Sequence, residues 1–89
     1  MPTHFIIVKG KVQGVFYRAT AKSVAKELNI NGWIKNNAVG DVECLVTGSE
    51  ISLNEFITWC RKGPANAEVS EVIVEEKDEV LFEKFSIVR

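Results

Sequence analysis

The sequence lacks charge imbalance, any dense cluster of basic residues and any long apolar run. Its 89 residues include 11 Lys and Arg against 12 Asp and Glu, a formal net charge of −1. This balance argues against extended contact with nucleic acid or anionic lipid, so any bound anion is expected to be small. No apolar run approaches the length of a membrane span, and Met1–His4 lacks the basic and apolar regions of a signal peptide. We therefore expect a cytoplasmic protein without a membrane segment.

Cysteine is scarce, and no metal-ligand pattern is present. Cys44 and Cys60 are the two cysteines, without the spacing of a metal site, and a reducing compartment leaves them as thiols. The acidic pairs Glu75–Glu76 and Asp78–Glu79 have no His or Cys partners nearby in sequence. We expect neither a disulfide nor a bound metal, and we interpret the lone His4 as structural or solvent-exposed.

The remaining composition is ordinary for a globular protein. Hydrophobic residues make up 46% of the chain and charged residues 26%, far from the composition of disordered chains. A chain of this length has room for one core and no second domain. We expect a single domain over residues 1–89, acting as a monomer.

Apolar periodicity predicts two helices, because apolar residues recur at i, i+3, i+4 and i+7 in two places. The first helix is expected from Arg18 to Leu28, ending at Asn29, which tolerates the left-handed backbone common at helix ends. The second is expected to begin after either Ser49 or Ser52 as the N-cap, a choice that the sequence leaves open. The two apolar stripes are Ala21, Val24, Ala25 and Leu28, and Leu53, Phe56, Ile57 and Cys60.

Alternating or continuous apolar segments predict five strands. They are expected at residues 4–11, 32–36, 41–47, 69–76 and 85–88, with a hairpin over residues 37–40 and a solvated turn at residues 77–79. The hairpin contains Asn37 and Gly40, two residue types that accept a positive φ. The order is β-α-β-β-α-β plus a short final strand. This order predicts an α+β, ferredoxin-like split βαβ sandwich: a mostly antiparallel four- to five-stranded sheet with both helices on one face.

The turn between the first strand and the first helix is typical of an anion site. Gly10 and Gly14 allow backbone conformations that other residues resist, and a helix begins directly afterwards. Such a turn directs unpaired N–H groups and the positive helix end at one point, which suits a phosphate. Arg18 lies in the first helical turn, where a cation is disfavoured by the helix dipole unless an anion is bound there. A surface salt bridge is the alternative explanation for Arg18.

Two stretches resemble the two signatures of the acylphosphatase family. Gly10–Arg18 resembles the first, and Gly32–Asn36 with Gly40, Val42 and Gly48 resembles the second. Val-Gln-Gly-Val followed by Arg, together with Gly-Trp-x-Lys-Asn further on, is an uncommon combination. The predicted element order agrees, so the resemblance covers essentially the whole chain.

The resemblance implies hydrolysis of a small-molecule acyl phosphate to a carboxylate and inorganic phosphate, without a cofactor or metal. It marks Arg18 and Asn36 as catalytic. The guanidinium would hold the phosphoryl oxygens, and the carboxamide, which does not titrate, would orient a water molecule. The amides of the preceding turn would complete the phosphate cradle; these are the amides of Lys11, Val12, Gln13, Gly14 and Val15.

The sequence departs from the family pattern beside these positions. Tyr17 stands where Phe or Met is usual, and Asn37 where a hydroxyl residue is frequent, so we expect Asn37 to alter water or substrate positioning slightly. The sequence leaves three alternatives to this interpretation. In the first, Asn36 only caps the end of a strand. In the other two, the chain is a phosphate-binding module without catalysis, or an RNA-binding domain of the same architecture. The charge and the missing aromatic strand motif oppose the last.

Overall fold

The computed structural model describes residues 1–89 and contains two helices and five strands in the predicted order. The elements are β1 (Thr3–Lys11), α1 (Tyr17–Glu27), β2 (Asn31–Asn36), β3 (Val42–Thr47), α2 (Glu50–Lys62), β4 (Glu68–Lys77) and β5 (Phe85–Ile87). Neither helix is long and apolar enough to cross a membrane.

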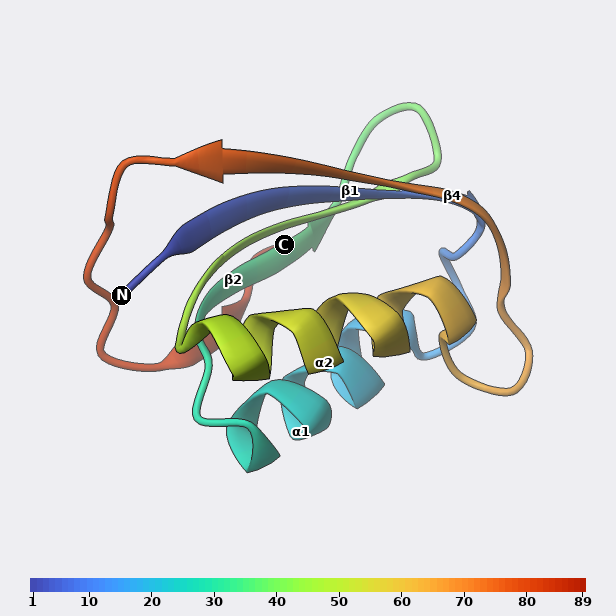
Figure 1. The fold of residues 1–89 in the computed structure, drawn as a ribbon. Helices are drawn as coiled ribbons and strands as arrows, with labels where there is room; N and C mark the ends of the chain where they lie inside the picture. Colours follow the sequence, from blue (N-terminus) through green and yellow to red (C-terminus); the bar gives the residue numbers. More distant parts are fainter.

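The strands form one sheet in the order β4-β1-β3-β2-β5. All neighbouring pairs are antiparallel except β2 and β5, which run parallel. Both helices lie against the same face of this sheet (Figure 1). The predicted α+β, ferredoxin-like sandwich is therefore confirmed, and its sheet has five strands, within the four to five that were expected.

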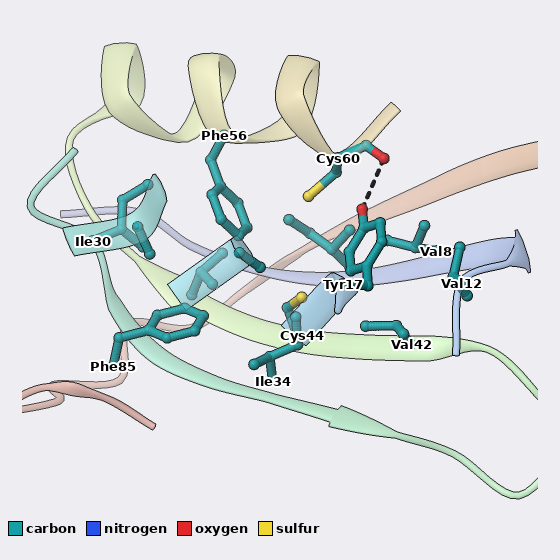
Figure 2. Packing of buried hydrophobic residues seen from close by; sticks show 14 of the residues in the cluster. Val8, Val12, Tyr17, Ile30, Ile34, Val42, Cys44, Phe56, Cys60 and Phe85 are labelled. Carbon is teal, nitrogen blue, oxygen red and sulfur yellow. Dashed lines mark hydrogen bonds between the residues drawn. The ribbon is translucent and has the colours of Figure 1, made fainter. Parts of the chain in front are cut away.

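The core fills the layer between the helices and the sheet (Figure 2). The inward residues of β1 and β3, among them Ile6, Val8 and Cys44, are fully buried. Phe56 and Cys60 of α2 cover them from the helical side. Both predicted stripes face the core, although Val24, Leu28 and Ile57 are only partly buried at its margin. Both cysteines are free and buried.

Several boundaries differ from the predictions by a few residues. β4 includes Lys77, which was expected in a solvated turn, because the strand pairs with β1 as far as Thr3. Ser49 is the N-cap of α2, and its hydroxyl accepts a hydrogen bond from the amide of Ser52. Asn29 has a φ of 56°, as expected after α1.

The β2–β3 hairpin uses Asn37 in a different way from that expected. Gly40 has a φ of 95°, but Asn37 is not among the residues with positive φ. Instead, its side-chain oxygen accepts hydrogen bonds from the amides of Val39 and Asp41 at 3.1 and 2.9 Å. Asn37 thus closes the turn through its side chain, as Asn does in Asx turns.

Candidate active site

The segment between β1 and α1 leaves the start of α1 without local compensation. Gly14 and Phe16 have φ values of 74° and 63°, so the chain reverses sharply before the helix. Phe16 occupies the N-cap position, but no side chain caps the helix and no acidic residue lies in its first turn. The N–H groups and positive dipole end of α1 are therefore available to an anion.

A pocket of about 290 Å³ adjoins this helix start and contains both residues marked as catalytic by the resemblance. No carboxylate side chain lines it, and Arg18 and Arg89 are its charged side chains; its lining residues are Val12, Gly14, Phe16, Tyr17, Arg18, Ala19, Asn36, Ile87 and Arg89. Arg18 comes from α1 and Asn36 from the last position of β2. Two residues from separate segments thus share one cavity.

The polar side-chain groups of Arg18 and Asn36 have no partner within the chain. Arg18 takes part in none of the four ion pairs, which involve Lys9, Lys35, Lys77 and the N-terminus. The carboxamide oxygen of Asn36 is buried and accepts no hydrogen bond. A buried acceptor without a partner costs about 1 to 3 kcal/mol, so this oxygen favours a donor from outside the chain, such as water.

The five residues of the predicted cradle are divided by the structure. Val12 and Gly14 line the pocket, whereas Lys11, Gln13 and Val15 do not. Lys11 is exposed at the end of β1, and Val15 is buried in the core.

Gln13 instead connects the turn to the β2–β3 hairpin. Its side-chain amide donates to the carbonyl oxygens of Asn37 and Asp41 at 3.0 and 2.8 Å. An ion pair between Lys9 and Asp41, with Nζ and Oδ2 3.1 Å apart, ties the same segments together. These contacts hold the hairpin that follows Asn36 against the turn that precedes Arg18.

Asn37 lies next to this junction but does not line the pocket. Its side-chain nitrogen donates to the Glu43 carboxylate at 3.0 Å, while its oxygen binds hairpin amides. Both ends of the carboxamide are therefore occupied by the hairpin.

Tyr17 is a structural contributor to the site that sequence reasoning missed. Its ring is buried in the core, and its hydroxyl donates to the carbonyl oxygen of Cys60 at 2.8 Å (Figure 2). Burial raises the pKa of this hydroxyl, and the neighbouring Cys60 raises it further by a smaller amount, so the hydroxyl stays protonated and remains a donor. The bond fixes the start of α1, directly before Arg18, to the end of α2. Hydrophobic periodicity indicates burial of Tyr17 but not the partner of its hydroxyl.

The Acylphosphatase family model matches residues 4–87. The chain belongs to the acylphosphatase family. A protein named Acylphosphatase from Legionella pneumophila (strain Lens) is 52% identical over 62 residues, which are 70% of this chain and 68% of that protein.

Solved structures agree with this assignment. An acylphosphatase from Bacillus subtilis superimposes with a TM-score of 0.96 and 34% identity, covering 100% of both chains. An acylphosphatase from Coxiella burnetii gives a TM-score of 0.95 and 37% identity, covering 98% of this chain and 92% of that one. The expected family, the fold and the assignment as an acylphosphatase enzyme are confirmed.

Proposed function

We propose that this acylphosphatase holds the phosphoryl group of its substrate with Arg18 and the backbone of the β1–α1 turn, and that Asn36 orients the attacking water. The observation that carries this proposal is the shared pocket, in which Arg18 has no ion pair and the Asn36 oxygen has no hydrogen-bond partner. The uncapped start of α1 borders the same pocket and favours an anion there.

The reaction needs few protein groups. Water oxygen attacks phosphorus while the bond between phosphorus and the acyl oxygen breaks, and the carboxylate leaves with the electron pair of that bond. A carboxylate is a weak base, so no general acid has to protonate it. The phosphoryl oxygens take up a proton from the water, and the products are carboxylate and inorganic phosphate. Positioning and charge stabilisation then supply the catalysis, with no metal ion in the proposed step.

Replacement of Arg18 tests the phosphoryl site. Removal of one preorganised donor typically costs about 3 to 4 kcal/mol of transition-state stabilisation. We expect Arg18→Gln to lower kcat/KM for benzoyl phosphate by roughly 100- to 1,000-fold, measured with and without a chelator. Lys22→Gln is the matched control, because Lys22 lies on the same helix outside this pocket. Near-normal turnover by folded Arg18→Gln would contradict the proposal.

Replacement of Asn36 separates water positioning from phosphate binding. We expect Asn36→Ala to lose turnover while inorganic phosphate still inhibits residual activity competitively, because the guanidinium remains. Asn54→Ala on the exposed side of α2 serves as the control. Parallel loss of turnover and phosphate binding in Asn36→Ala would refute the water-orienting role.

The same assays address the other functions. Phosphate binding by the unmodified protein without turnover of any acyl phosphate would select the non-catalytic anion-binding module. Binding of single-stranded RNA that weakens with salt would select the RNA-binding alternative.

We further propose one acylphosphatase domain over residues 1–89, working as a monomer in the cytoplasm on a small-molecule substrate, without nucleic acid. The net charge of −1 and the free thiols of Cys44 and Cys60 support this setting. Light scattering at micromolar concentration tests the monomer.

A further inference from the structure

Phe16 has two features that do not favour folding. Its φ of 63° places a residue with a β-carbon in the left-handed region, which costs about 1 to 2 kcal/mol. Phe16 is also 79% exposed, so its side chain gains little from burial. Glycine at this position would avoid the backbone cost. Strain and an exposed aromatic ring at one residue indicate a role for the side chain outside the core.

The position of Phe16 suggests what that role is. Phe16 lines the pocket that contains Arg18 and Asn36. Val12 and Tyr17 line it as well, but both are almost fully buried and offer little surface to a ligand. Of the other apolar lining residues, Ala19 of α1 is exposed and Ile87 of β5 is half-buried, and these two elements contact each other. Phe16 is therefore the largest exposed apolar side chain of the pocket.

We propose that Phe16 and Ile87 form an acyl subsite that favours acyl phosphates with a flat apolar acyl group, above all an aromatic one. This inference rests on the proposed function, because Arg18 and Asn36 must first hold the phosphoryl end. The acyl group then extends over the Phe16 ring. Aromatic pairs gain stabilisation beyond the area that they bury, whereas an acetyl group is too small to cover the ring.

Arg89 lines the same pocket and sets the opposing expectation, an acyl group that carries a second anion. The side chain of Arg89 is exposed, and exposed ion pairs contribute little in water. A guanidinium also packs favourably over an aromatic ring, so Arg89 is compatible with an aromatic acyl group. Succinyl phosphate, which ends in a carboxylate, distinguishes the two expectations.

The experiment compares kcat/KM for benzoyl, acetyl and succinyl phosphate in the unmodified protein, Phe16→Ala and Phe16→Leu. We expect the ratio of benzoyl to acetyl kcat/KM to fall about five- to tenfold in Phe16→Ala and less in Phe16→Leu, which keeps an apolar side chain. Leu81→Ala is the matched control, because Leu81 is 82% exposed and lies outside the pocket. The inhibition constant of inorganic phosphate should stay within twofold in Phe16→Ala, which separates loss of the ring from distortion of the turn.

Three results would overturn the inference while leaving the proposed function intact. They are an unchanged ratio in Phe16→Ala, a loss that is equal for both substrates and matched by weaker phosphate inhibition, and a preference for succinyl phosphate that Arg89→Gln abolishes. Failure of the unmodified protein to hydrolyse any of the three substrates would instead overturn the proposed function, and the subsite with it.

Discussion

Tyr17→Phe removes one hydroxyl group from the interior and leaves one carbonyl oxygen without a donor. Cys60 lies in the last turn of α2, where carbonyl groups lack helical partners. Its regular partner would be the amide of residue 64, but Pro64 has no N–H. The hydroxyl of Tyr17 supplies the missing donor at 2.8 Å.

The expected cost follows from this geometry. A buried carbonyl group that loses its only partner costs about 1 to 3 kcal/mol, and the phenyl ring of the variant still fills the same space beside Trp59. We expect the free energy of unfolding to fall by about 2 kcal/mol, and the melting temperature by roughly 8 to 16 °C for a domain of this size. Because Tyr17 precedes Arg18, we also expect weaker inhibition by inorganic phosphate in the folded variant.

Urea unfolding at pH 7 measures the stability change. Thr58→Val is the matched control, because it also removes a hydroxyl that donates to a carbonyl oxygen of α2, here that of Asn54, but on the exposed surface. It should change the free energy of unfolding by less than about 0.5 kcal/mol. A Tyr17→Phe variant within 0.5 kcal/mol of the unmodified protein, or an equal loss in Thr58→Val, would show that the Cys60 carbonyl does not depend on this bond.

Three further changes test other parts of the structure. Gln13→Ala removes both hydrogen bonds to the hairpin carbonyls. We expect the free energy of unfolding in urea to fall by about 1 to 3 kcal/mol and kcat for benzoyl phosphate to decrease. An unchanged kcat would show that other contacts hold the hairpin. A β-carbon on Gly10 would lie 2.2 Å from a backbone oxygen of β4, whereas one on Gly14 would meet no atom within 4 Å. We therefore expect the free energy of unfolding to fall by at least about 3 kcal/mol in Gly10→Ala and by only about 1 to 2 kcal/mol in Gly14→Ala. Equal losses would show that crowding at Gly10 does not matter. Burial raises the pKa of the Cys60 thiol from its ordinary 9.0 to about 12, so this thiol ionises first in the unfolded chain. The stabilisation that follows from the raised pKa is complete below pH 9 and is lost between pH 9 and 12, by up to about 1.4 kcal/mol per pH unit. The free energy of unfolding should therefore decrease less steeply with pH in Cys60→Ala than in the unmodified protein. Equal slopes in the two proteins would argue against the raised pKa.

Much of the fold was predictable because its signals are local. The apolar stripe that contains Ala21 and Ala25, the helix stop at Asn29 and the break after Lys62 each depend on residues within a few positions. The element order left few topologies, and the glycine-bearing turn before Arg18 indicated an anion site without any knowledge of the sheet. The backbone preference of Asn37 was a poorer guide. A positive φ was expected there, but the side chain of Asn37 closes the turn by a hydrogen bond instead.

Periodicity and backbone restrictions act over short distances, so the sequence was enough to predict the two helices, the order of the elements along the chain and the glycine-bearing turn, and its motifs carried the resemblance to the acylphosphatases. Which of these segments meet depends on packing between distant parts of the chain. This packing brought the Gln13 amide to two hairpin carbonyls, the Tyr17 hydroxyl to the end of α2, and Phe16 to the pocket shared by Arg18 and Asn36. These contacts join residues far apart in the chain, and their geometry depends on how the helices pack on the twisted sheet, which no short stretch of sequence specifies.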